Sequence, residues 1–436
     1  MFEEGSVGGR LATANIDGRE YESGGSIIHN SNQLMLDFLD ICGLQKKVPI
    51  PDETFSILSQ NGPMFQVNFL YFFYIIYDYF KSIFQETGYS IVDKLRLAWK
   101  YGTFNLIKLE RFYQSILADF LKIYKSLKEG KGFKTMEEVL NEMNPNFDEL
   151  TQTPLANHLS EEVGLPDPLI EDIVSAATKF NYGQLPSEMP AFVGAVALIG
   201  FDKQLWAVEG GNVRVAECAL RLSGAKLERR RVGEITKEED GRYRIDSSDE
   251  LYDVIIIATP LTADTSDLRV DGERMVVPGS YHRTVATLVQ AELNVSSLGV
   301  AAADWETSHY FFVAPEFPVW SVETMTPVDY SPERDAELPP VYRLFSHQPL
   351  TEAALSKMFS SIRHVSETDW LAYPHYPLGD SLGKFERESG LYHINSVETA
   401  ASAMEMSVLG ARNVVNLIRN DIRDTDMKST ADKSEL

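Results

Sequence analysis

The sequence is poor in cysteine and has no excess of basic residues. Its 436 residues include two cysteines, Cys42 and Cys218, which excludes a framework of several disulfides. One bridge is possible, although two buried thiols are the commoner arrangement and the one we expect. Acidic residues outnumber Lys and Arg by 64 to 40, and no basic stripe stands out, which argues against nucleic acid as a partner.

Other features are absent as well. Met1 runs directly into acidic residues and glycine, so we expect no secretory signal at the start of this sequence. No G-x-G-x-x-G motif occurs in it. The apolar run at residues 69–77 is much shorter than the ~20 residues that a spanning helix needs, so we expect no transmembrane segment. The 44% hydrophobic content suffices for one large or two moderate domains.

Residues 67–85 differ from the rest of the chain. They hold nine aromatic residues and show the period of neither a strand nor a helix. The dipeptide Phe65-Gln66 recurs at their end as Phe84-Gln85, and the residue types are those of AT-rich codons. We weigh two interpretations, a short in-frame retained intron and a genuine apolar loop or lid, and expect the segment to lie outside the compact core.

The remaining sequence alternates between helical and strand patterns. A helix is predicted over residues 32–44, and amphipathic helices are predicted over 89–128. Strands are predicted at 226–232, 243–245, 284–293 and 391–397. The run YDVIIIATP, residues 252–260, is typical of a fully buried parallel strand. A helix of small residues follows the last strand, and residues 423–436 are polar enough to predict a disordered tail.

The first ten residues suggest a dinucleotide site. In such folds an acidic residue at the end of the second strand binds ribose hydroxyls, and Glu3 fits that role. Gly8 and Gly9 let the backbone approach a ligand, because neither carries a Cβ atom. Arg10 offers several donors for a phosphate, or for a carboxylate that braces the turn. Each feature alone is weak, because an isolated glycine more often marks a plain turn.

The order of several segments along the chain is more specific. They are EEGSVGGRLAT (3–13), YESGGSIIH (21–29), FNYGQ (180–184), AFVGAVAL (191–198), LWAVEGGN (205–212), YDVIIIATPL (252–261), TLVQAELN (287–294), WLAYPHY (370–376) and ETAASAMEMS (398–407). In this order the chain resembles the flavin amine-oxidase superfamily and, within it, the prenylcysteine oxidase family, also called prenylcysteine lyase. The resemblance spans nearly the whole chain and is interrupted at 67–85, which supports the intron interpretation.

The resemblance implies an α/β fold, in which an FAD/NAD(P)-binding Rossmann-like domain is interleaved with a helical and mixed-sheet substrate domain. The FAD-binding domain would comprise residues 1–45, 205–262 and 388–422, and the substrate domain residues 46–204 and 263–387. The family pattern places a first strand, a glycine-rich turn and a helix before Glu3. We therefore expect a sheet that lacks its first strand, and weak FAD binding by these residues alone.

The resemblance also assigns site residues. FAD would be contacted by Glu3, Gly8, Gly9, Arg10, Gly24, Gly25, Ser26, Val232, Glu398, Ala403 and Met404. The last two would place helix N-terminal amides near the negative charge of reduced flavin. The isoprenyl-cysteine substrate would be lined by Tyr182, Phe192, Trp206, Trp370, Tyr373 and His375. His29 is a candidate catalytic residue, although a structural histidine is the commoner case. No metal site is expected.

The chemistry of the family is oxidation of a thioether. A hydride would leave the first isoprenyl carbon for the flavin, water would add to that carbon, and the adduct would release cysteine and an isoprenyl aldehyde. Dioxygen would then reoxidise the flavin and form hydrogen peroxide. Two alternatives stay open. One is an amine-oxidase-like flavoenzyme with another substrate, because a fold does not determine its substrate. The other is a flavin-free, non-enzymatic relative.

A lysosomal or secretory location is implied by the resemblance too. The acidic composition is compatible with an acidic lumen. Asn294-Val295-Ser296 is the only N-x-S/T sequon in the sequence, so Asn294 is a candidate glycosylation site.

Overall fold

The computed structural model describes residues 1–2, 5–48, 54–59, 62–68, 99–200, 205–298, 309–312, 317–376, 378–379 and 381–434. Glu3 lies outside these residues, and so does the aromatic-rich segment from residue 69 onward. The role expected of Glu3 and the expectation that this segment avoids the core therefore stay predictions.

The largest sheet has seven strands in the order β17-β13-β16-β15-β14-β4-β5. In chain order they are β4 (Thr54–Ser59), β5 (Gly62–Asn68), β13 (Tyr281–Leu293), β14 (His309–Phe312), β15 (Ser321–Met325), β16 (Val341–Ser346) and β17 (Phe359–Pro374). A hairpin of β1 (Thr13–Ile16) and β2 (Arg19–Glu22) packs on one face, where Ile16 and Tyr21 contact Leu288 and Val341. We call this the hairpin face. The expected strand at 284–293 is confirmed as part of β13.

A small mixed sheet contains the strand expected within residues 252–260. β10 (Ile255–Ile257) runs parallel to β19 (Leu391–His393), and β18 (Glu386–Glu388) pairs antiparallel on the far side. Ile256 is 44% exposed, so the strand is not buried on both faces as predicted. Among the described residues, no strand pairs with the other edge of β10.

A five-stranded sheet lies beside it, with the order β12-β11-β7-β8-β9. Its strands are β7 (Glu234–Lys237), β8 (Tyr243–Ile245), β9 (Leu251–Tyr252), β11 (Arg269–Val270) and β12 (Glu273–Arg274), and β3 (Ile28–His29) pairs separately with β6 (Leu205–Trp206). The prediction of a strand at 226–232 is wrong, because the only β-pairing of these residues is an isolated bridge between Phe2 and Glu228 among the described residues. Arg230 and Arg231 instead form ion pairs with Asp246 and Asp267.

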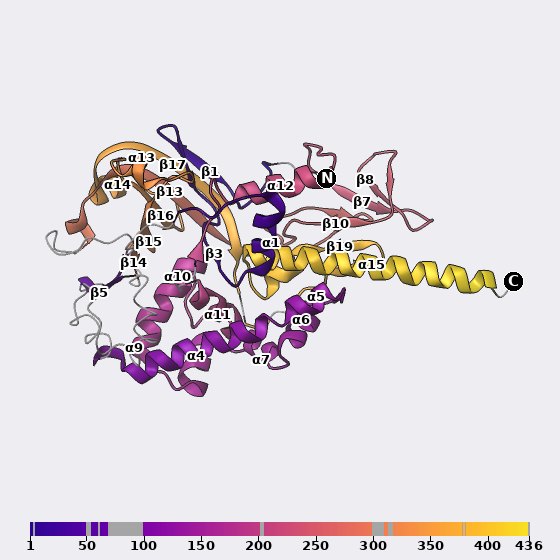
Figure 1. Cartoon of the computed structure of the whole chain (residues 1–436), viewed down its shortest axis with the longest axis horizontal. Helices are drawn as coiled ribbons and strands as arrows, with labels where there is room; N and C mark the ends of the chain where they lie inside the picture. Colours follow the sequence, from indigo (N-terminus) through magenta and orange to yellow (C-terminus); the bar gives the residue numbers. More distant parts are fainter. Residues whose placement is uncertain are drawn as a thin grey trace.

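Most of the helices gather on one side of the large sheet, in the lower half of Figure 1. They are α4 (Thr103–Phe120), α5 (Ile123–Lys128), α6 (Met136–Met143), α7 (Phe147–Gln152), α8 (Leu155–Asn157), η1 (His158–Glu162), α9 (Asp167–Leu169), η2 (Ile170–Val174), α10 (Ser175–Tyr182) and α11 (Ala191–Ile199). Almost all of α11 is buried, and Gly194 permits this because a Cβ there would lie 2.4 Å from Leu155 Cδ2. The shorter elements elsewhere are η3 (Val295–Leu298), α13 (Pro332–Asp335), α14 (Glu352–Met358) and η4 (Ile394–Thr399).

The last helix is longer than the sequence indicates. α15 (Met404–Ser434) continues through residues 423–434, where a disordered tail is predicted, and Figure 1 shows it extending beyond the rest of the chain. Leu409, Val414 and Leu417 are buried in its first half. This packed half supplies the helical nucleus, and adding residues to an existing helix is far less costly than starting one. None of the described helices is long and apolar enough to span a membrane.

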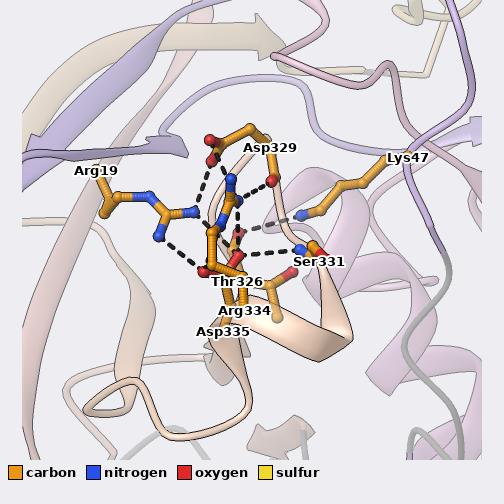
Figure 2. A network of polar contacts seen from close by, with 7 residues as sticks. All are labelled: Arg19, Lys47, Thr326, Asp329, Ser331, Arg334 and Asp335. Atoms are coloured by element: carbon orange, nitrogen blue, oxygen red, sulfur yellow. Dashed lines mark hydrogen bonds and ion pairs between the residues drawn. The ribbon is translucent and has the colours of Figure 1, made fainter.

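An ion-pair network holds the hairpin to the connection between β15 and β16 (Figure 2). Arg19 donates to both carboxylate oxygens of Asp335, at 2.9 and 3.0 Å, and to Asp329 at 2.8 Å. Arg334 donates to Asp335 as well, and these two arginines hold the pKa of Asp335 well below its ordinary range. Lys47 binds the same connection through the carbonyl of Thr326, at 3.1 Å.

Cys42 and Cys218 form a disulfide, with their Cα atoms 6.1 Å apart, so the expectation of two free thiols is wrong. The bridge joins the last residue of α1 (Gln33–Cys42) to the middle of α12 (Val213–Ser223), and the two cysteines are 176 residues apart in the sequence. Both belong to the predicted FAD-binding domain. Sequence spacing gives no sign of the pairing, because the whole helical layer intervenes.

Removing this bridge should destabilise the protein. Because it closes a long loop of the unfolded chain, we expect Cys42→Ala/Cys218→Ala to lose about 2–5 kcal/mol in urea unfolding. Protein made in an oxidising compartment should show no free thiol when denatured without reductant, whereas Cys42→Ala alone should expose one. Two titratable thiols in the denatured wild-type protein would contradict the assignment.

Candidate functional site

A cavity of about 60 Å³ lies beyond the carboxyl ends of β10 and β19. In α/β sheets, ligands bind at this edge of parallel strands. Its lining includes Thr262, Tyr281, His375, Ser396 and Glu398. Within the described residues, no group of His, Cys, Asp or Glu side chains is arranged to hold a metal ion.

Glu398 is the buried acid of this site, with 1% of its surface exposed. Its two carboxylate oxygens accept hydrogen bonds from the Arg10 guanidinium and the Tyr281 hydroxyl. Burial alone would lower the pKa of Arg10, but the Glu398 charge holds it above its ordinary value. Burial and the same carboxylate raise the pKa of Tyr281. At neutral pH Arg10 is therefore a guanidinium and Tyr281 a neutral phenol.

Arg10 also organises its surroundings through further contacts of its side chain and its backbone. Its Nη1 donates to the Ala372 carbonyl at 2.9 Å, near the end of β17, and to Ser402 Oγ at 3.4 Å. Its own carbonyl accepts a hydrogen bond from the Gly25 amide at 3.1 Å. A Cβ at Gly24 would lie 2.1 Å from that carbonyl oxygen, so only glycine fits there. We call residues 24–26 the glycine loop.

Glu22 and Asn212 hold the glycine loop from the other side. The Asn212 amide donates to Glu22 Oε1 at 2.7 Å, and Asn212 Nδ2 donates to the Gly25 carbonyl at 2.9 Å. Gly211 precedes Asn212 with φ of +101°, a conformation that favours glycine. Burial raises the pKa of Glu22 to about 7, against the opposing effects of the Asn212 hydrogen bond and Arg343.

Three tyrosines form an aromatic wall beside Ser402. The Tyr182 ring packs edge-on against Tyr373 and Tyr376, with centroids 5.3 and 5.5 Å apart. The Tyr182 hydroxyl donates to the Ser402 carbonyl, and the Ser402 amide donates to the Tyr376 hydroxyl, each at 2.8 Å. We use the term aromatic wall for these three tyrosines. They hold the backbone just before the first turn of α15.

The first turn of α15 provides the amides expected from the sequence. Ala403 and Met404 stand at its N-terminus, where amides have no partner within the helix. Glu405, the next residue, accepts hydrogen bonds from the amides of Leu34 and Met35, both at 2.9 Å, at the start of α1. Glu405 therefore caps a neighbouring helix, and α15 and α1 are held in register at the site.

A second ion pair reaches the glycine loop from the large sheet. Arg343 of β16 donates through Nη2 to Glu323 Oε2 at 2.6 Å and to Ser26 Oγ at 3.0 Å. Arg343 and Glu323 are cross-strand neighbours, both about 2% exposed. Together with Ser321 we call them the polar niche. No sequence signal separates these polar strand residues from ones that face solvent, and our sequence reasoning missed them, although it named Ser26.

The remaining sequence-predicted residues are spread more widely. His375 lines the cavity and lies 5.0 Å from His282, ring to ring. Trp370 stands opposite Thr284 on the hairpin face. Phe192 packs in the helical layer against Phe147. Of the sequence-predicted residues that the structure describes, His375 and Glu398 line the cavity, and the others, among them His29, Trp206, Val232, Gly8 and Gly9, do not.

His29 and Trp206 lie together away from the cavity, in the short β3–β6 pair. The ring nitrogen Nδ1 of His29 accepts a hydrogen bond from the Ser31 amide at 3.1 Å, and Lys46 lies over the Trp206 ring. Val232 packs on the cluster around Tyr243. These contacts are structural in kind, and the roles expected for these residues stay predictions.

Comparison with known proteins gives a consistent result. The family model for prenylcysteine lyase matches residues 84–433. Prenylcysteine oxidase 1-like from Bos taurus is 30% identical over 459 residues, covering 99% of this chain and 88% of that protein. Prenylcysteine oxidase 1 from Homo sapiens is 30% identical over 443 residues, covering 96% of this chain and 82% of that protein.

Solved structures share the fold. A triple mutant of putrescine oxidase has a TM-score of 0.60 at 14% identity, covering 96% of this chain and 93% of that chain. Cyclohexylamine oxidase from Brevibacterium oxydans has a TM-score of 0.58 at 14% identity, covering 97% of this chain and 93% of that chain. At these identities the likeness shows the fold alone, and it confirms the α/β fold with a substrate domain that the sequence predicts.

The raised pKa of Glu22 should make stability depend on pH. Its folded pKa of about 7 exceeds the ordinary 4.5, so the folded state holds an extra proton between these values. Unfolding free energy should therefore fall as pH rises from about 4.5 to 7, by roughly 3 kcal/mol from this group. Glu22→Gln should lack that component. Urea unfolding of both proteins at pH 5 and pH 8 tests this, and an identical pH slope would contradict it.

Arg10 and Glu398 should be strongly coupled in stability. Arg10→Met leaves the buried Glu398 carboxylate with only the Tyr281 hydroxyl, and should cost about 3 kcal/mol. The double variant Arg10→Met/Glu398→Gln should recover much of that loss, because it removes the uncompensated charge. A double-mutant cycle from urea unfolding measures the coupling, and additive losses would show that the pair does not act as a unit.

Proposed function

Because the chain belongs to the prenylcysteine lyase family, we propose that it is an FAD-dependent oxidase that cleaves the thioether of isoprenyl-cysteine. The observation that carries the proposal is the family match over residues 84–433, which includes the aromatic wall, the polar niche and Glu398. The relatives named prenylcysteine oxidase align with nearly all of this chain. The similarity therefore extends over all parts of the site, and it supports proposing the same reaction.

The residues at the site fit the flavin and ribityl portions of FAD. Glu398 uses one hydrogen bond on each oxygen, which leaves it further acceptor positions beside the cavity for ribityl hydroxyls. The amides of Ala403 and Met404, which have no partner within α15, are suited to a negatively charged ring edge. The glycine loop presents backbone without Cβ atoms at Gly24 and Gly25. Bound FAD would supply hydride acceptance and the return of electrons to dioxygen.

The overall reaction balances with water and dioxygen. An isoprenyl-cysteine thioether, water and dioxygen give cysteine, the isoprenyl aldehyde and hydrogen peroxide. The carbon next to sulfur is oxidised by two electrons and loses its bond to sulfur, while dioxygen is reduced by two. This reaction demands little acid–base work from side chains, and the neutral tyrosines of the aromatic wall are consistent with that.

The chain's own residues would bind and orient the substrate. Tyr182 and Tyr373 offer ring faces and edges to an unsaturated hydrocarbon, while their hydroxyls are occupied by Ser402 and Thr284. Burial of apolar isoprenoid surface in such a setting is the main source of affinity. An amine-oxidase-like activity is the second candidate, because the solved structures that share the fold include putrescine oxidase and cyclohexylamine oxidase.

We also propose a secretory or lysosomal location. Its support is the Cys42–Cys218 disulfide, since such bonds persist in oxidising compartments. Asn294 is exposed at the end of β13, where a glycan could attach without disturbing the sheet. The acidic composition is compatible with an acidic lumen.

The reaction can be tested directly. Protein supplied with FAD and S-farnesylcysteine in air should form cysteine, farnesal and hydrogen peroxide in equal amounts, whereas putrescine and cyclohexylamine should form no peroxide. Flavin absorbance of the purified protein, with thiol, aldehyde and peroxide assays, provides the readout. Peroxide from amines alone would favour the second candidate. Failure to retain any flavin would favour a flavin-free relative.

A further inference from the structure

The polar niche has more hydrogen-bonding capacity than the described residues satisfy. Glu323 Oε1, Arg343 Nε and Ser321 Oγ are buried and have no hydrogen-bond partner there. The three residues are between 0 and 2% exposed. More than nine in ten buried polar groups in folded proteins find a partner, so a cluster of three unpartnered atoms requires an explanation.

These atoms share one face of the sheet. Glu323 and Arg343 are directly opposed across β15 and β16, so their side chains leave on the same face. Ser321 is two residues before Glu323 and projects to that face too. It is the hairpin face, because Arg343 also contacts the Glu22 carbonyl and Ser26 Oγ. The polar niche therefore faces the glycine loop.

A purely structural ion pair explains only part of this arrangement. The Nη2–Oε2 bond and the bond to Ser26 fasten the glycine loop to the sheet. They do not use Glu323 Oε1 or Arg343 Nε, and burying a charged group with an unused hydrogen-bonding atom is unfavourable. Apolar residues of similar volume would fasten the two layers without that penalty. The unused atoms indicate a ligand that carries its own charges.

We propose that the polar niche binds the zwitterionic amino-acid end of the substrate, with Glu323 as the residue that selects a free α-ammonium group. Glu323 Oε1 accepts from the ammonium, Ser321 Oγ accepts a second of its hydrogens, and Arg343 Nε donates to the carboxylate. The inference rests on the proposed function, since it names what recognises the polar half of an isoprenyl-cysteine.

The placement suits a substrate with one apolar and one charged end. The polar niche lies on β15 and β16, and Tyr373 of the aromatic wall lies on β17, with β13 between them. Ser26 connects the polar niche to the glycine loop, and Arg10 connects that loop to β17. Charge would thus be bound on one side of the loop and hydrocarbon on the other.

The experiment compares two thioethers that differ only in the amine: S-farnesylcysteine and S-farnesyl-3-mercaptopropionate. Wild-type protein should prefer the first by about 10- to 100-fold in kcat/KM, mainly through KM, as expected for losing a buried charged hydrogen bond. In Glu323→Gln this ratio should fall below about 5-fold, and Ser321→Ala should lower it by about 3-fold. Glu292→Gln, an exposed acid on β13 of the same sheet, is the matched control and should keep the wild-type ratio.

The outcomes separate the two proposals. If wild-type protein oxidises both thioethers equally well, or if Glu323→Gln keeps the wild-type ratio, the polar niche does not recognise the α-ammonium group of the substrate. The proposed oxidase function is unaffected by either result. If neither thioether yields peroxide with flavin bound, the proposed function itself fails. Should Glu323→Gln not fold, as judged by circular dichroism, the wild-type ratio and the Ser321→Ala ratio decide the question.

Discussion

The buried Glu398 carboxylate holds the site together, because it binds side chains from two distant parts of the chain at once. Arg10 comes from the turn before the hairpin, and Tyr281 comes from the start of β13. Glu398 itself lies in the last turn of η4, shortly before α15. Burying a carboxylate that is 1% exposed is strongly unfavourable unless such partners neutralise it. The three segments must therefore pack together in the folded protein.

The glycine loop depends on the same interaction. Arg10 is held by its side chain at Glu398, and its carbonyl then becomes the fixed point against which Gly24 and Gly25 pack. Arg343 holds the other end of the loop at Ser26. The loop is thus fastened by two arginines from different layers, one through a backbone contact and one through a side chain. The position of the glycine loop therefore depends on the large sheet, through Arg343, as much as on the turn that carries Arg10.

A feature of this structure could be predicted from the sequence when local residues determine it, and not when the whole fold determines it. The parallel pairing of β10 and the helix predicted over residues 32–44 were predictable, because apolar runs and helical spacing are local properties. The Cys42–Cys218 bridge and the Glu323–Arg343 pair were not, because both depend on segments brought together by the whole fold. The long α15 was missed because its polar end is extended from a packed beginning that local composition does not reveal.

The same reasoning explains why the resemblance identified Glu398 and Arg10 separately but not as partners. Sequence order places one at each end of the chain, and only the fold closes a separation of 388 residues. Once closed, the pair commits part of the Arg10 guanidinium, since Nη2 binds Glu398 and Nη1 binds the Ala372 carbonyl, while the expected contact of Arg10 with FAD stays a prediction. Of the two roles that the sequence left open for Arg10, the brace for a carboxylate is the one it performs in the structure.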